Sequence, residues 1–347
     1  MAQQSSWKKY LITAIKIAMS IAILGYLYRL ASQEEQLAEL ALNPKKWHWL
    51  AASFGMCLFA HLISYVRWGI LVRALGIEFS TVDATRIGLI GLCFGLVSIG
   101  VVGGDSIRIF YAARQARNRL ADAFCSVFLD RALGMLTMFT FATVGFVWIG
   151  VHSESAEPEK IGHVQLVCKV ISVATLIGWV VMGAFFLTPN IANSKLIKKL
   201  KGIPKVGAIL GQLSDSALLY KEKTGAVLIS IAMSALVNFG FVGSVFLLAV
   251  GLNVEHPPLT KHLMIAPISM AANAIPLPGG IGGMEPMLSY FYAAFSSSSE
   301  YGPGVLVAFG FRFMLLVMAA LGAVAWFLSR EQIRGLVPDQ DSPADES

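Results

Sequence analysis

The sequence predicts an all-α polytopic membrane protein with six full spans and two re-entrant or broken-helix hairpins, arranged as an inverted-topology repeat. Of the 347 residues, 56% are hydrophobic and only 14% are charged, and the mean hydropathy is +0.67. Apolar segments long enough to span a membrane recur along the chain. The connections between them are alternately rich and poor in basic residues. No stretch is polar enough to form a soluble domain, so we expect one integral domain over residues 1–335.

The six spans are predicted from segments long enough to cross a hydrocarbon layer of about 30 Å. Lys8 and Lys9 before the first segment resemble the start of a signal peptide. That segment is long enough to span and no convincing small-residue cleavage site follows it, so we expect an uncleaved helix. The expected spans are roughly 10–28, 47–66, 121–150, 163–187, 225–250 and 304–328.

Two further apolar regions, 87–103 and 261–295, are predicted to be hairpins. The second contains Ala274 to Pro286, where three prolines and four glycines oppose an unbroken helix. A break at membrane depth is tolerated only where protein or water covers the freed backbone groups, and the alternative is a kink inside an ordinary span. The residues expected to form broken-helix backbone are Gly103, Gly104, Pro276, Pro278, Gly279, Gly280, Gly282 and Gly283.

The distribution of Lys and Arg favours the hairpin interpretation. If both regions return to their own side, the segments on one side hold eighteen Lys and Arg, among them Arg67 and Arg108, and the segments on the other side hold five. Basic residues in short loops favour the cytoplasm. We therefore expect a multi-pass protein of the plasma (cytoplasmic) membrane with both termini cytoplasmic.

The same assignment predicts an internal repeat. Repeat 1, about 10–150, and repeat 2, about 163–330, each follow the order span, span, hairpin, span, but they start from opposite sides. Gly103-Gly104-Asp105 in the first repeat corresponds to Gly282-Gly283-Met284-Glu285 in the second. The next intramembrane arginine follows at a similar distance, Arg131 after Asp105 and Arg312 after Glu285. The acidic tail 336–347 is expected to be disordered.

Charged side chains within hydrocarbon are costly and are functional candidates by default. Asp105 is a candidate for contact with substrate; the alternative is that it caps the helix that follows and pairs with Arg108, three residues later. Glu285 precedes Pro286, which suits the first turn of a helix, so its carboxylate is expected near the positive end of that helix. For both acids a purely structural role is the alternative.

Arg131 and Arg312 are expected to face a cavity between the repeats. Guanidinium groups beside the N-termini of broken helices suit a phosphate, and structural pairing to Asp105 and Glu285 is the alternative. Asp130 is adjacent to Arg131 and should point in another direction. The candidate substrate-binding residues are Asp105, Arg108, Asp130, Arg131, Asn238, Asn273, Glu285 and Arg312.

Enzyme motifs are not visible. The chain has no Gly-x-Ser-x-Gly, His-Glu-x-x-His or Walker pattern, so we predict no catalytic residue and no cofactor. The cysteines are far apart within apolar segments and are interpreted as buried thiols, with no metal-ligand spacing: Cys57, Cys93, Cys125 and Cys168.

Three motifs in order resemble the lysylphosphatidylglycerol synthase transmembrane (flippase-like) family. They are Gly103-Gly104-Asp105-Ser106-Ile107-Arg108, Leu129-Asp130-Arg131-Ala132-Leu133-Gly134 and the stretch from Ile275 to Glu285. In bifunctional members this domain moves an aminoacylated phospholipid between leaflets, and a separate cytosolic domain performs the aminoacyl transfer. The thirteen residues after Arg334 are too few for such a domain. The resemblance therefore implies a lipid-translocating scaffold and gives no basis for assigning lysyl-phosphatidylglycerol as its substrate.

The leading hypothesis is a lipid translocator that moves a phosphate-bearing or otherwise anionic membrane lipid between leaflets. One alternative is a non-catalytic membrane partner that docks a glycosyltransferase or lipid synthase through the Lys-rich segment 195–223. Another is a carrier for small soluble anions. Nucleic acid is not an expected partner, and the sequence does not predict an oligomeric state.

Overall fold

The computed structural model describes residues 43–97, 100–116, 119–150, 158–187, 207–274, 282–295 and 302–328. Within these ranges the chain forms ten α-helices and one 3₁₀ turn, and it has no strand. The predicted all-α class is confirmed. Five helices are long and apolar enough to cross a membrane: α3 (Trp47–Ala74), α6 (Leu120–Ile149), α7 (Pro158–Leu187), α10 (Thr224–Leu252) and α13 (Gly302–Leu328).

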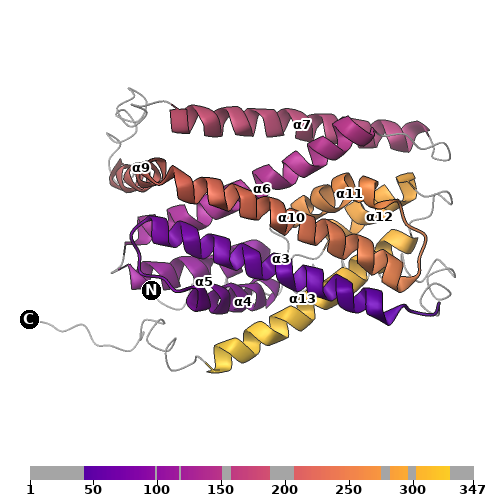
Figure 1. Ribbon diagram of the computed structural model, residues 1–347, viewed down its shortest axis with the longest axis horizontal. Helices are drawn as coiled ribbons and strands as arrows, with labels where there is room; N and C mark the ends of the chain where they lie inside the picture. Colours follow the sequence, from indigo (N-terminus) through magenta and orange to yellow (C-terminus); the bar gives the residue numbers. More distant parts are fainter. Residues whose placement is uncertain are drawn as a thin grey trace, which may run out of the picture.

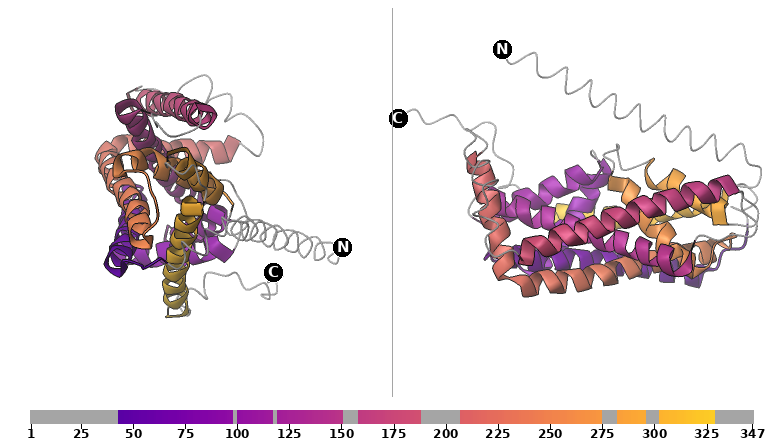
Figure 2. Two further views of the ribbon diagram at one scale, coloured as in Figure 1. Left: turned by 90° about the vertical axis from the view of Figure 1, so that its right-hand side faces the viewer. Right: turned by 90° about the horizontal axis from the view of Figure 1, so that it is seen from above.

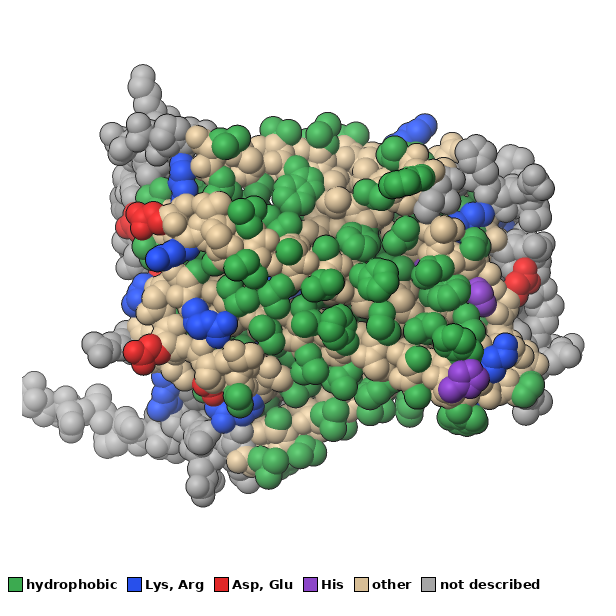
Figure 3. Space-filling view, viewed as in Figure 1, with side chains coloured by type: hydrophobic (Ala, Val, Ile, Leu, Met, Phe, Trp, Pro, Cys, Tyr) green, Lys and Arg blue, Asp and Glu red, His purple; other side chains and the backbone are tan. Residues whose placement is uncertain are grey.

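These five helices coincide with five of the six expected spans. The remaining expected span, 10–28, lies outside the described residues, as do the tail 336–347 and the part 195–206 of the Lys-rich segment. In Figure 1 the long helices follow the long axis of the molecule. Figure 3 shows hydrophobic side chains over the middle of this face and charged side chains gathered toward its two ends. This surface suits a bilayer, because an apolar belt meets hydrocarbon and the charged ends meet water.

The antiparallel helices α3 and α10 pack against each other along their length. Gly240 on α10 lies against Ala60 on α3, where an added Cβ would come within 2.9 Å of the alanine methyl group. Farther along the pair, the Ser53 hydroxyl donates to the Ser244 carbonyl oxygen at 2.7 Å. Small residues let the two backbones approach, and the hydroxyl bonds replace the hydrophobic driving force that is missing in lipid.

The first hairpin consists of α4 (Thr81–Val97) and α5 (Gly100–Gln115). The predicted helix break at Gly103 and Gly104 is wrong, because both residues lie inside α5. A Cβ on Gly104 would overlap the carbonyl oxygen of Gly91 on α4. The glycine is therefore needed for the close approach of two helices, at the modest cost of a glycine within a helix.

The second hairpin consists of α11 (Leu259–Ala271), the 3₁₀ turn η2 (Ala272–Ala274) and α12 (Met284–Phe295). Among the described residues, η2 ends at Ala274 and α12 begins at Met284, and Gly282 and Gly283 lie outside helices, with Gly282 in the left-handed region at φ 95°. A Cβ on Gly283 would overlap the carbonyl oxygen of Ala272. Four of the predicted break residues lie outside the described ranges: Pro276, Pro278, Gly279 and Gly280.

Two long helices tie the hairpins together. Helix α6 contacts α5 and also α11, where Gly145 packs on Met264. Helix α13 contacts α12 through Gly304 and α4 through Gly322. Figures 1 and 2 show α4 and α5 toward one end of the molecule and α11 and α12 toward the other, and α5 contacts η2. Each long helix therefore joins both hairpins, and α6 and α13 run in opposite directions.

The periphery is formed by α7 and by α9 (Gly207–Glu222). Helix α7 lies along the upper edge in Figure 1, packs on α6 and α12, and exposes apolar side chains over most of its length. Helix α9 lies across one end of the long helices, as the right view of Figure 2 shows. The Tyr220 hydroxyl fixes α9 there by donating to the Leu71 carbonyl oxygen at 3.0 Å.

Candidate functional site

The first hairpin is joined to the helix that follows it by an ion pair between Asp105 on α5 and Arg131 on α6. The guanidinium donates Nε to Asp105 Oδ2 at 2.9 Å and Nη2 to Oδ1 at 2.6 Å, a two-point geometry that fixes both side chains. Asp105 lies in the second turn of α5, since the helix begins at Gly100. The alternative in which Asp105 caps the helix is therefore wrong, and so is its pairing with Arg108.

The second hairpin carries a corresponding ion pair between Glu285 on α12 and Arg312 on α13. Arg312 donates Nε and Nη2 to Glu285 Oε1 at 3.0 and 2.5 Å. The other carboxylate oxygen accepts the backbone N–H of Gly282 at 2.9 Å. Helix α12 begins at Met284, so Glu285 lies at the positive end of the helix as predicted.

The two ion pairs differ in exposure. The Arg131 side chain is 44% exposed, whereas those of Glu285 and Arg312 are 3% and 13% exposed. Arg131 lies eleven residues into α6 and Arg312 ten residues into α13, which places each about 15 Å from the start of its helix. Both arginines therefore lie well away from the ends of their helices.

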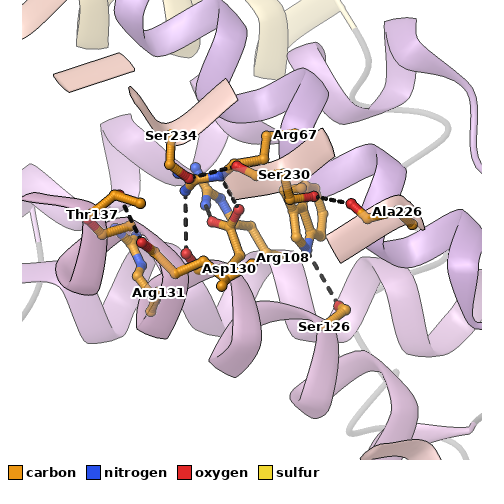
Figure 4. A network of polar contacts seen from close by, with 12 residues as sticks. Arg67, Arg108, Ser126, Asp130, Arg131, Thr137, Ala226, Ser230 and Ser234 are labelled. Carbon is orange, nitrogen blue, oxygen red and sulfur yellow. Dashed lines mark hydrogen bonds and ion pairs between the residues drawn. The ribbon is translucent and has the colours of Figure 1, made fainter. Parts of the chain in front are cut away.

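A third polar group, buried between α3, α5, α6 and α10, consists of Arg67, Arg108, Asp130 and Ser234. Arg67 donates Nε to Asp130 Oδ1 at 2.8 Å, Nη2 to the Asp130 carbonyl oxygen at 3.2 Å and Nη1 to the Ser234 hydroxyl at 2.6 Å. Figure 4 shows Arg67 and Arg108 converging on Asp130. The prediction that Asp130 and Arg131 point to different partners is confirmed.

Arg67 was missed by sequence reasoning. It directly follows the apolar segment 47–66, so it was counted in a cytoplasmic segment, as was Arg108. The structure places both arginines inside helices, with exposures of 4% and 6%. Counting Arg67 outside the helices is wrong, because the buried Asp130 carboxylate pairs with it there; Arg108 lies 3.8 Å from the same carboxylate. The signal that could have found Arg67 is Asp130, a buried acid whose sequence neighbour has another partner.

Arg108 has an environment unlike that of the other three arginines. Its guanidinium carbon lies 5.3 Å from the ring centre of Tyr65 and 5.4 Å from that of Trp68, a cation–π arrangement. Its Nη1 is 3.8 Å from Asp130 Oδ2, which is too long for a hydrogen bond.

The two candidate asparagines have different surroundings. The Asn238 amide donates to the Thr137 hydroxyl at 3.2 Å and to the Ser234 carbonyl oxygen at 2.8 Å, so it joins α10 to α6. Asn273 lies in η2, and its side-chain oxygen is buried without a hydrogen-bond partner among the described residues. The structure thus places Asn273 at the tip of the second hairpin and Asn238 within a helix contact.

Comparison with known protein families identifies the family to which this chain of helices and buried ion pairs belongs. A family model described as the lysylphosphatidylglycerol synthase TM region matches residues 13–322. The chain belongs to this family. No curated protein and no solved structure matches the chain.

Membership in the lysylphosphatidylglycerol synthase TM region family has two consequences here. The match includes both hairpins and every residue of the three polar groups. It also supports a membrane protein with a lipid-related function, in agreement with the apolar helices. Among the described residues, no group of three or more His, Cys, Asp or Glu side chains is arranged to hold a metal ion.

Proposed function

We propose that this protein is a lipid translocator of the plasma membrane that moves a phosphate-bearing lipid between leaflets, without chemistry on the lipid. The observation that carries the proposal is that each hairpin is held by a carboxylate–arginine pair to the helix that follows it, while that helix also packs against the other hairpin. Polar groups at this depth are typical of pathways for polar cargo.

The proposed architecture is an inverted-topology repeat. The segment 10–28, α3, the α4–α5 hairpin and α6 would form one repeat, and α7, α10, the α11–α12 hairpin and α13 the other. Three pairings support this: antiparallel α3 and α10 pack together, α6 contacts α11, and α13 contacts α4. The glycine contacts of Gly104 on Gly91 and of Gly283 on Ala272 occupy corresponding places just before the two acids. Inverted repeats of this kind place their sites near the midplane.

The proposed mechanism is a rocking of one repeat against the other with both termini on the cytoplasmic side. A headgroup enters between the repeats from one leaflet while its acyl chains stay in the bilayer. Its phosphate exchanges with Asp105 and Glu285 for the donors of Arg131 and Arg312. The displaced carboxylates must then take up a proton or another partner as the hairpins shift, because an unpaired buried charge is costly.

The experiment measures leaflet exchange in proteoliposomes. Fluorescent phosphatidylglycerol, phosphatidylcholine, phosphatidylethanolamine and a polyprenyl phosphate are each placed in vesicles, and a membrane-impermeant reductant quenches the outer leaflet. The protein should accelerate loss of fluorescence from the inner leaflet for at least one phosphate-bearing lipid. The double variant Arg131→Gln, Arg312→Gln should abolish this acceleration, whereas Arg73→Gln, at the end of α3, should retain it. No acceleration over empty vesicles with any of these lipids would refute the proposal.

A parallel measurement separates lipid translocation from transport of soluble anions. The same vesicles are loaded with inorganic phosphate or chloride, and efflux is followed. A lipid translocator leaves anion efflux at the rate of empty vesicles.

A further inference from the structure

The buried charges of the described chain are not balanced. Asp105 with Arg131 and Glu285 with Arg312 are neutral pairs. In the third group a single carboxylate, Asp130, faces both Arg67 and Arg108. That group therefore carries one excess positive charge.

The excess charge is located on Arg108. Asp130 is committed to Arg67, which takes one of its oxygens at 2.8 Å and also bonds its backbone oxygen. Arg108 is 3.8 Å from the remaining oxygen, and no hydrogen bond from its guanidinium to any described residue is formed. A buried guanidinium has five N–H donors, and leaving them without acceptors is costly.

A second unsatisfied group lies beside Arg108. Tyr65 is only 2% exposed and its hydroxyl oxygen is buried. This oxygen has no hydrogen-bond partner within the described part of the chain. Its ring is one of the two aromatic faces that Arg108 covers. A buried hydroxyl without a partner is uncommon in folded proteins, and a ligand is one of the few explanations for it.

We propose that Arg108 and the Tyr65 hydroxyl form the binding site for one singly charged phosphodiester, the phosphate of a phospholipid with an otherwise uncharged headgroup. A single negative charge balances the excess positive charge, and phosphate oxygens accept from both a guanidinium and a phenol. Groups with two or more negative charges fit less well, because Arg131 and Arg312 are already paired with carboxylates. This inference rests on the proposed function and names the first residues to hold the headgroup.

Native mass spectrometry of the delipidated full chain in detergent tests the site. Phosphatidylglycerol with short acyl chains is titrated against wild type, Arg108→Gln and Tyr65→Phe, with Arg73→Gln as the control. We expect Arg108→Gln to weaken binding by about tenfold or more and Tyr65→Phe by about threefold to tenfold, with no change for the control. The Tyr65→Phe variant keeps the ring and its contacts, so it remains informative where Arg108→Gln lowers stability.

Competition identifies the chemistry of the ligand. Diacylglycerol should not compete with phosphatidylglycerol, and inorganic phosphate or pyrophosphate at equal concentration should displace little of it. Equal binding by wild type and both site variants would overturn the site. Displacement by inorganic phosphate as effective as that by the lipid would overturn its assignment to a lipid headgroup.

The outcome also separates this inference from the proposed function. If Arg108→Gln changes neither leaflet exchange nor lipid binding, translocation is still supported and this site is refuted. If lipid binding depends on Arg108 but the wild-type protein shows no leaflet exchange, translocation is refuted and the lipid site is supported.

Discussion

Replacing Asp130 by Asn tests whether the buried charges of α3, α5 and α6 hold the fold together. The substitution keeps the shape and one acceptor oxygen for Arg67, 2.8 Å away, but it removes the only carboxylate of the group. Two buried guanidinium groups then face each other without an anion, and the new amide directs its own N–H groups toward Arg108. Breaking a buried ion pair by removing one partner costs about 3 to 5 kcal/mol. We expect about 3 kcal/mol here, because one hydrogen bond persists.

The assay is reversible unfolding in mixed micelles, with the free energy taken from a titration of the denaturing detergent. The matched control is Asp83→Asn, which weakens an ion pair with Arg86 whose side chains are 22–24% exposed and which should cost less than about 1 kcal/mol. The free energy lost by the double variant Asp130→Asn, Arg67→Gln should be smaller than the sum of the losses of the two single variants, by about 1 to 3 kcal/mol. A loss below about 1 kcal/mol for Asp130→Asn, or strictly additive losses, would refute the reasoning.

The other predictions concern the hairpins. Gly104→Ala and Gly283→Ala each place a methyl group against a backbone carbonyl, so each should destabilise the protein by about 1 to 3 kcal/mol in the same titration. Gly55→Ala, with open space around it, should not destabilise it. Equal stability of all three variants would contradict the close approach of the backbones. Asp105→Arg alone should lower stability in the same titration. The exchanged pair Asp105→Arg, Arg131→Asp should recover part of that stability, since α5 and α6 can be joined by either polarity. A double variant no more stable than the single one would contradict this joining role.

The sequence predicted the spans and the second hairpin well because their signals are local. Hydropathy over the long segments and the glycines before Met284 depend on nearby residues only; five expected spans coincide with long apolar helices, and Gly282 and Gly283 lie outside helices. Asp105 and Glu285 pair with Arg131 and Arg312, which the sequence analysis gave as the alternative to arginines that face a cavity.

The errors arise where a residue's partner is distant in sequence. Gly104 looked like a chain break, but it is required by Gly91 on another helix. Arg67 looked like a loop residue, because hydropathy cannot show that Asp130 lies beside it. Tyr65 gave no signal at all, since a tyrosine in an apolar segment is ordinary until its hydroxyl is found without a partner.

A cross-link between the repeats tests the central claim most directly. An added Cβ at Gly145 on α6 lies 3.2 Å from the Cβ of Leu263 on α11, and one at Gly69 on α3 lies 2.8 Å from that of Ala84 on α4, within one repeat. Disulfides hold the two Cβ atoms about 3.5–4.5 Å apart, so a small outward shift of the helices allows either bond. Both cysteine pairs are introduced after replacement of the native cysteines Cys57, Cys93, Cys125 and Cys168. Oxidation should stop leaflet exchange in the Gly145→Cys, Leu263→Cys protein and reduction should restore it, while the Gly69→Cys, Ala84→Cys protein continues to exchange lipid. Unchanged exchange with the repeats fully cross-linked would contradict the account.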